Sequence, residues 1–345
     1  MNKYGILLLP SHNRVYTDSE TILALGELQL ASLYFGNAFT NISEEIIGSV
    51  PYITFECGIP LSEDMLRILS RLSFTYAIFK LTPNGLDPID KIVPCYFDED
   101  LVTIQKYSGK TNELFTRFLV NVAFLSGKKR HLDPEEPIRI LDPICGRGTT
   151  LLEGLIQGYQ CTGVEIDKKQ VEQLVQFFTR YLKTKKYKHQ VEKKNITDHT
   201  GTLGMAYQFT MARTKESYKA GDVLSMKVIR GDTLQIPRLL RKETFHHIIG
   251  DLPYGVQHGS NNPSGSFTRN PSQLLEKSLP GWIQVLEPDG TLALSWNTFV
   301  LKREKMIDIL QSHGLMVFTQ PPYDQFLHRV DQAILRDVIV AQKQS

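Results

Sequence analysis

The sequence predicts an α/β fold in which helices cover a central sheet of seven strands, with a small α+β domain in front. Three observations carry this prediction. From residue 138 onward, apolar runs typical of buried strands alternate with helical patterns. The first of these runs, Ile138 to Ile144, stops at a Gly-x-Gly pair followed by a helix start. The first hundred residues instead show a β-α-β-α-β order.

The length and charge of the chain limit what it can be. With 345 residues it is expected to form two domains, placed here at 1–105 and 106–345. Hydrophobic content of 41% and charged content of 22% are typical of a soluble globular protein. A formal net charge of +2 excludes a uniformly basic, polyanion-coating protein. Basic residues gather in the middle, where ten Lys or Arg face three Asp or Glu between Arg180 and Ala220.

Cysteines and apolar runs indicate the compartment. The four cysteines form no C-x-x-C pair and have no nearby histidine set, so neither a disulfide framework nor a metal site is expected. The apolar run at the N-terminus is too short for a signal peptide, and no run reaches membrane-spanning length. We therefore expect a cytoplasmic protein with no membrane partner.

The front domain carries strands and helices but no chemical constellation. Strands are predicted at Lys3–Leu9, Tyr52–Phe55 and Thr75–Leu81, with helices at Asp18–Phe35 and Ser62–Leu72. This order is typical of a ferredoxin-like α+β domain. The acidity of this region, with eight basic against thirteen acidic residues in 1–110, disfavours it as the main phosphate-binding surface. Positioning is its expected role.

The glycine loop is the first candidate binding site. In DPICGRGTT, residues 142–150, small residues after a strand let backbone N–H groups approach the polar end of a ligand. A dinucleotide-binding loop would have a third glycine where this chain has Leu151. The loop residues that we expect to contact a ligand are Asp142, Pro143, Cys145, Gly146, Gly148, Thr149 and Thr150.

The next strand, in residues 160–167, ends in two acids. Glu165 lies 17 positions beyond Gly148, where a nucleotide-binding fold places a carboxylate that accepts from both ribose hydroxyls. Asp167 is a second candidate for the same ligand, or the N-cap of the helix Lys168–Leu182. Both readings of Asp167 stay open.

The second strong motif is Asp251-Leu-Pro-Tyr-Gly255, directly after the strand His246–Gly250. An exocyclic amine of a nucleobase is a poor nucleophile because its lone pair is delocalised into the ring. A carboxylate and a main-chain carbonyl that accept its two N–H bonds direct that lone pair to an electrophile, while an aromatic ring stacks on the extruded base. Asp251, the Leu252 carbonyl and Tyr254 suit these three roles, and Pro253 stiffens the loop.

The two motifs resemble those of known enzymes. DPICGRGT looks like the S-adenosylmethionine loop of class I methyltransferases, and DLPYG resembles the Asp/Asn-Pro-Pro-Tyr/Phe motif of amino-methylating enzymes, with Leu252 in place of the first proline. Residues 106–345 therefore resemble the tRNA guanosine N2-methyltransferase family that usually carries a THUMP domain. The front third is too short for a full THUMP module. Gly255 favours the guanosine enzymes over the DNA adenine enzymes.

This resemblance implies a Rossmann-like, seven-stranded class I fold, S-adenosylmethionine as cofactor and RNA, with tRNA as the expected class, as substrate and partner. It adds to the cofactor set Asp232 and Thr233, at the position that accepts from the adenine amino group, and Asp251, which faces the methyl donor as well as the acceptor. A homodimer or an accessory protein could replace the missing RNA-binding module.

The segment of about 183–223 is predicted to be a basic insertion. Its lysines and its aromatics, expected to be exposed, suit a nucleic-acid backbone and unstacked bases; the aromatics are Tyr187, Tyr207, Phe209 and Tyr218. A solvated charged helix with a flexible loop is the alternative. At the level of function, a DNA amino-methyltransferase (adenine N6 or cytosine N4) and a non-catalytic cofactor- or RNA-binding module remain as alternatives.

Overall fold

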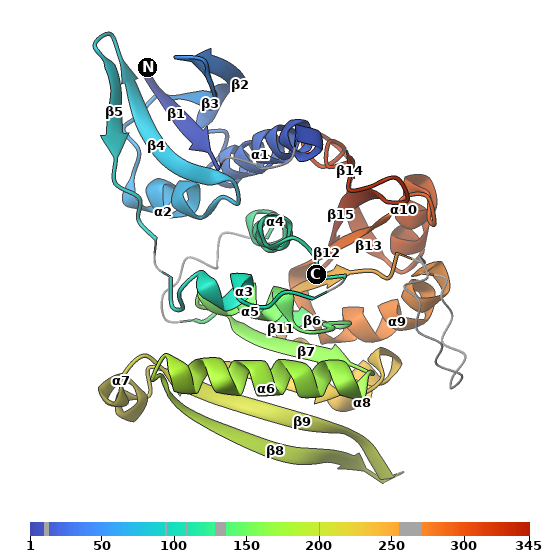
Figure 1. Ribbon diagram of the computed structural model, residues 1–345. Helices are drawn as coiled ribbons and strands as arrows, with labels where there is room; N and C mark the ends of the chain where they lie inside the picture. The colour runs from blue at the N-terminus through green and yellow to red at the C-terminus, as the bar shows by residue number, and fades with distance from the viewer. Residues whose placement is uncertain (10–13, 94, 108, 128–135, 200, 255–270) are drawn as a thin grey trace.

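The computed structural model describes residues 1–9, 14–93, 95–107, 109–127, 136–199, 201–254 and 271–345. These residues form two β-sheets with helices between them (Figure 1). The N-terminal sheet has five strands and the second sheet has ten. No helix of the described residues is long and apolar enough to cross a membrane.

The N-terminal sheet is antiparallel, with strand order β2-β3-β1-β4-β5. The first four strands follow the ferredoxin-like order, so the predicted α+β architecture is confirmed. The prediction missed two strands, β2 and β5. The elements are β1 (Asn2–Leu8), α1 (Arg14–Tyr34), β2 (Phe39–Ile47), β3 (Val50–Cys57), α2 (Glu63–Arg71), β4 (Thr75–Thr82) and β5 (Gly85–Ile89).

The second sheet runs β13-β15-β12-β11-β6-β7-β10-β9-β8, with the short β14 paired to β15. Its helices are α3 (Asp100–Thr103), α4 (Glu113–Leu125), α5 (Thr149–Ile156), α6 (Lys168–Thr184), α7 (Lys215–Ala220), α8 (Ile236–Leu239), α9 (Pro271–Val285) and α10 (Arg303–Ser312), with the 3₁₀ turn η2 (Thr233–Gln235). Its strands are β6 (Arg139–Asp142), β7 (Gln160–Glu165), β8 (Lys188–Asp198), β9 (Gly201–Ala212), β10 (Leu224–Arg230), β11 (Phe245–Asp251), β12 (Leu286–Asn297), β13 (Leu315–Phe318), β14 (His328–Arg329) and β15 (Leu335–Lys343).

The seven predicted strands are present as the run from β13 to β10. Strands β10, β7, β6, β11 and β12 pair in parallel, and β15 and β13 complete the run by antiparallel pairing. The direction of the strand order reverses between β6 and β11. Open α/β sheets bind their ligands at the carboxyl ends of the strands at such a reversal. The loops after β6 and β11, which carry the two motifs, therefore meet there.

The segment of about 183–223 differs from both predicted forms, an insertion with exposed aromatics and a solvated charged helix with a flexible loop. Strands β8 and β9 form an antiparallel hairpin that extends the sheet from β10. The expectation of exposed aromatics was wrong: Phe209 on β9 is fully buried in the core, and Tyr187, Tyr207 and Tyr218 are partly buried. The edge strand β8 exposes Lys188, Lys193 and Lys194. Lysines on an edge strand hinder pairing with other chains, so these charges have a structural explanation too.

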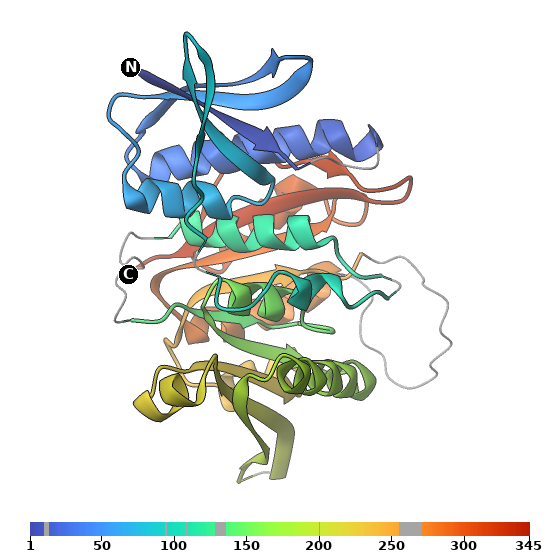
Figure 2. The same cartoon turned by 60° about the vertical axis from the view of Figure 1, so that its left-hand side comes forward.

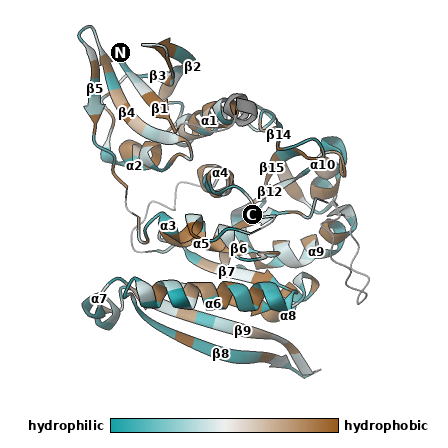
Figure 3. Ribbon diagram, in the orientation of Figure 1, coloured by the Kyte–Doolittle hydropathy of each residue, from teal (hydrophilic) through white to brown (hydrophobic). Residues whose placement is uncertain are grey.

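Two helical layers join the sheets. In Figure 2, α1 and α2 lie between the N-terminal sheet and α4. The buried carboxylate of Glu27 on α1 accepts from the backbone N–H of Ser73 at 2.9 Å and from Nδ2 of Asn121 on α4 at 2.7 Å. In Figure 3, hydrophobic residues predominate on α5, inside the second layer, whereas α7 is mostly hydrophilic. The N-terminal sheet is thus fixed against α4, whose first residues border the site described next.

Candidate active site at the carboxyl ends of the strands

The glycine loop takes a shape that only glycine adopts easily. Gly146 and Gly148 have φ of 52° and 80°, in the left-handed region. A Cβ at Gly148 would lie 2.7 Å from the Leu174 side chain on α6. Gly148 is the N-cap of α5. The backbone N–H groups at the start of α5 therefore turn to the carboxyl ends of the strands, as predicted for a ligand-binding loop.

Glu165 ends β7 next to this loop. Its Oε2 accepts from the Gly146 N–H at 2.9 Å and its Oε1 from the Asp167 N–H at 2.7 Å. A carboxylate has about four acceptor sites, so Glu165 keeps capacity beyond its backbone donors to accept from a ribose. Burial raises the pKa of Glu165.

The Asp167 carboxylate caps α6. Its Oδ1 accepts from the backbone N–H of Lys169 at 2.7 Å and of Gln170 at 3.3 Å. This is the capping alternative that the sequence left open. A contact of Asp167 with the cofactor stays a prediction.

The other loop residues mostly shape the loop from inside. Asp142, Pro143, Cys145 and Thr150 are buried. Oδ1 of Asp142 accepts from the Ile144 N–H at 3.1 Å, which closes the turn after β6. Thr149 is half-buried, and its hydroxyl is hydrogen-bonded to the Tyr107 hydroxyl at 3.2 Å. The backbone of the loop, more than these side chains, is available to a ligand.

The burial of Asp142 predicts a pH-dependent stability. Burial raises the pKa of Asp142 to about 7, above the unfolded value of about 3.9. Its contribution to stability is therefore fully present below pH ~4 and is lost as the pH rises through ~7. Asp142→Asn removes this titration. We expect the wild type to lose up to about 1.4 kcal/mol per pH unit relative to the variant in that window, measured by urea unfolding. Parallel pH profiles would contradict this prediction.

Asp232 and Thr233 follow β10, the neighbour of β7. Arg230 is in register with Glu165, so the ends of the two strands lie side by side. Oδ1 of Asp232 accepts from the Leu234 N–H at 2.9 Å and caps the turn η2. The buried Thr233 hydroxyl accepts from Nε1 of Trp282 at 2.9 Å. The side chain of Asp232 is thus near the predicted cofactor site, whereas that of Thr233 packs inward.

The Asp251 carboxylate, at the tip of β11, accepts hydrogen bonds from three hydroxyl groups. Its Oδ1 accepts from the Tyr254 hydroxyl at 2.6 Å and from the Ser295 hydroxyl, and its Oδ2 accepts from the Thr111 hydroxyl at 2.7 Å. The sequence prediction missed Thr111 and Ser295. Ser295 had a signal, since it is a polar residue near the end of the fifth predicted strand. Thr111 had none, because only tertiary packing brings residue 111 to residue 251.

Of the other residues of the second motif, Leu252 packs in the core and Tyr254 contacts Asp251. The Leu252 side chain is 1% exposed and belongs to the core, which explains a leucine at this position. Pro253 is exposed. Burial raises the pKa of Tyr254 well above its ordinary value, so its hydroxyl stays protonated and donates. The Arg336 guanidinium lies 5.2 Å from the centre of the Tyr254 ring. Gly255 and the expected loop 256–269 lie outside the described residues.

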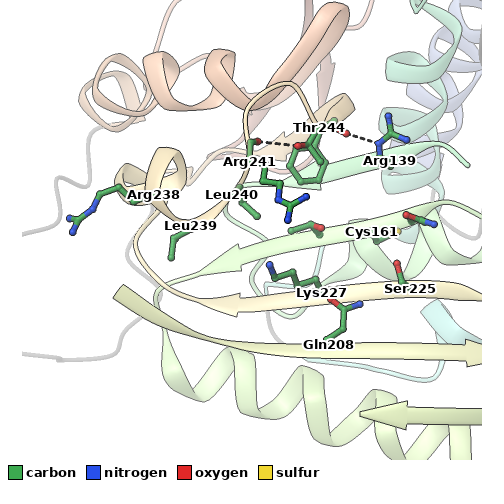
Figure 4. A pocket seen from close by; sticks show the side chains of 13 residues that line it. Arg139, Cys161, Gln208, Ser225, Lys227, Arg238, Leu239, Leu240, Arg241 and Thr244 are labelled. Carbon is green, nitrogen blue, oxygen red and sulfur yellow. Dashed lines mark hydrogen bonds between the residues drawn. The ribbon is translucent and has the colours of Figure 1, made fainter. Parts of the chain in front are cut away.

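A hollow of about 500 Å³ lies elsewhere, where β6, β7 and β11 begin. Figure 4 shows Lys227 on β10 among the residues that line this hollow, together with Arg238 and Arg241. It is at the opposite end of the strands from Asp142, Glu165 and Asp251. The hollow is therefore separate from the predicted site.

Residues 130–295 match the family model of the RMKL-like methyltransferase domain. No curated protein matches the sequence.

Solved structures with a similar course of the chain include a TehB-like SAM-dependent methyltransferase from Corynebacterium glutamicum (15% identity, 63% of this chain and 86% of that chain, TM-score 0.31). Others are an rRNA methylase from Streptococcus thermophilus (11%, 61% and 88%, TM-score 0.31) and TehB from Haemophilus influenzae (11%, 66% and 61%, TM-score 0.35).

The family match supports methyl transfer as the reaction class. It spans both motifs, from the glycine loop to the strand that carries Ser295. Within the described residues, no group of three or more His, Cys, Asp or Glu could hold a metal ion. The match over residues 130–295 is to a methyltransferase domain, which agrees with S-adenosylmethionine as the expected methyl donor.

Proposed function

We propose that this protein transfers a methyl group from S-adenosylmethionine to the exocyclic N2 amine of guanosine in RNA, with tRNA as the expected substrate. The observation that carries the proposal is the carboxylate of Asp251. It lies at the tip of β11, beside the glycine loop at the reversal of the sheet order, and three hydroxyls fix its position.

The residues around the loop fit the cofactor. The carboxylate of Glu165 at the end of β7 keeps acceptor capacity beyond its backbone donors, which suits the hydroxyls of a ribose. The Asp232 carboxylate on the neighbouring strand end suits an adenine amino group. Gly146 and Gly148 leave the loop backbone open to the amino-acid portion. When bound, this cofactor supplies an electrophilic methyl group.

Asp251 and Leu252 suit an amine acceptor. Three hydroxyls occupy three of the about four acceptor sites of the Asp251 carboxylate, so one site remains for an N–H bond. None of the described residues donates to the Leu252 carbonyl, which can accept the second N–H. Two acceptors in fixed positions hold the amine lone pair in one direction. The ring of Tyr254 is the proposed stacking surface for the base.

Surface charge supports a nucleic acid as the partner. Among the exposed lysines of β8, Lys194 pairs with Glu192, and the others form no ion pair with a described residue. Lys227 and Arg241, which line the hollow of about 500 Å³, form none with a described residue either. Cations that no carboxylate neutralises suit phosphates and make binding salt-dependent. The proposed role of the N-terminal domain, residues 1–105, is to position the RNA against the site.

Competition between two substrates tests the proposal. The protein is incubated with methyl-labelled donor, a tRNA mixture and duplex DNA, and label is counted in each fraction. We expect incorporation in the tRNA that excess duplex DNA does not suppress. Label in DNA alone would replace the proposal with the DNA amino-methyltransferase alternative. Donor binding without label in either would leave a non-catalytic module.

A further inference from the structure

A buried arginine without a hydrogen-bond partner lies beside the proposed acceptor site. Arg336 on β15 is 5% exposed, and its Nε has no hydrogen-bond partner. Its guanidinium lies 4.1 Å from the ring centre of Phe115 on α4 and 5.2 Å from that of Tyr254. No carboxylate of the described residues forms an ion pair with it. A buried charge is costly unless an acceptor meets it, and two ring faces compensate only part of that cost.

Arg336 lines a cavity of about 340 Å³. Thr111, which donates to Oδ2 of Asp251, lines the same cavity. Both parts of the chain contribute walls, with Leu23 and Phe74 from the N-terminal unit facing Phe115 from α4. The volume lies in the range of small-molecule sites. Apolar residues supply part of the wall, and seven polar or charged residues line the rest, among them the carboxylates of Glu20 and Glu113.

The polar groups of this cavity favour an uncharged ligand with acceptor atoms. His328 also lines the cavity, and burial lowers its pKa to about 4, so its ring is neutral near pH 7. Lys110 is already paired with Glu113. The guanidinium of Arg336, whose donors are unsatisfied, is therefore the positive group that remains to recognise a ligand. Its contacts with the rings of Phe115 and Tyr254 hold it in place.

The planar guanidinium of an arginine, with two parallel N–H donors, matches the O6 and N7 edge of guanine. Guanine presents O6 and N7 as adjacent acceptors, and a bidentate arginine is the most frequent specific contact to them. Adenine presents an amino group in place of O6, which would oppose the guanidinium. A phosphate would also accept these bonds, but the carboxylates of Glu20 and Glu113, which line the same cavity, disfavour a further anion and so favour an uncharged base.

We propose that Arg336 binds the O6 and N7 edge of the acceptor guanine in this cavity and so selects guanine as the methylated base. This inference rests on the proposed function, because it assumes that the N2 amine of the same base lies at Asp251. Arg336 and Asp251 would then hold opposite sides of one ring system, with Tyr254 against its face.

A base analogue at the methylated position tests recognition of O6 by Arg336 separately from methyl transfer itself. Two copies of a substrate RNA carry either guanosine or 2-aminopurine riboside at the methylated position. The analogue keeps the 2-amine and N7 and lacks O6. The variant Arg336→Met removes all donors at similar length, and Arg329→Met, an exposed arginine of β14, is the matched control. Donor affinity and thermal unfolding are measured for each protein.

We expect wild type and Arg329→Met to prefer guanosine roughly tenfold or more in kcat/KM, and Arg336→Met to lose most of that preference with donor affinity unchanged. An unchanged preference in Arg336→Met would overturn the inference and leave the function intact. Equal use of both RNAs by the wild type would overturn it as well, even if the variants fail to fold. Transfer to neither RNA would overturn the proposed function and with it this inference.

Discussion

Asp251→Ala is expected to abolish methyl transfer, and Asp251→Asn to lower kcat by about 10²- to 10³-fold, with the affinity for S-adenosylmethionine nearly unchanged. The alanine removes the carboxylate that we assign to the acceptor amine. The asparagine keeps its shape but offers an amide group to the hydroxyls of Thr111, Tyr254 and Ser295, which now donate to the carboxylate. Single-turnover rates and donor titration, measured side by side, check this result.

The control for Asp251 is Asp324→Asn, a change at an exposed aspartate that should leave both quantities as they are. Loss of donor binding in Asp251→Asn would show that Asp251 holds the cofactor instead of the amine. Full activity of the same variant would remove Asp251 from the chemistry altogether.

Glu165→Gln is expected to have the opposite signature, with weaker donor binding and a smaller effect on the rate at saturating donor. Two charge-assisted hydrogen bonds to a ribose contribute about 3 kcal/mol together, or about 10²-fold in Kd. The amide cannot accept from both neighbouring N–H groups, of Gly146 and Asp167, and also from two hydroxyls. Calorimetric titration of the donor measures the change.

A matched control lies on the adjacent helix. Glu172 on α6 is exposed and pairs only with Lys168 at 3.7 Å, so Glu172→Gln should bind the donor like the wild type. An unchanged donor affinity in Glu165→Gln would refute the ribose assignment. A reduced rate with unchanged affinity would place Glu165 on the acceptor side.

Local patterns predicted the parts of the molecule that depend on local chemistry. The glycine loop, the acid at the end of β7 and the motif after β11 were recognised because each needs special residues at fixed spacing. The strand order that brings them together follows from the alternation of strands and helices. Leu252, an unusual residue for this motif, became clear only when its side chain was seen in the core.

Tertiary contacts determined what the sequence could not predict. Strand β2 alternates weakly and contains Asn41 with φ of 51°, which interrupts the strand pattern. The hairpin of β8 and β9 has one polar edge strand, so it reads as a loop. Thr111 lies 140 positions before Asp251, to which it donates, and Arg336 lies 82 positions after Tyr254, whose ring it approaches. No local pattern indicates either contact.

The identity of the labelled nucleoside tests the central claim most directly. Wild type and Asp251→Asn are incubated with methyl-labelled donor and total cellular RNA, the RNA is digested, and the labelled nucleoside is identified by mass. We expect N2-methylguanosine from the tRNA fraction with the wild type and about 10²-fold less of it with the variant. A label on any other nucleoside, or an equal yield from both proteins, would contradict the assignment of Asp251 to the guanine amine.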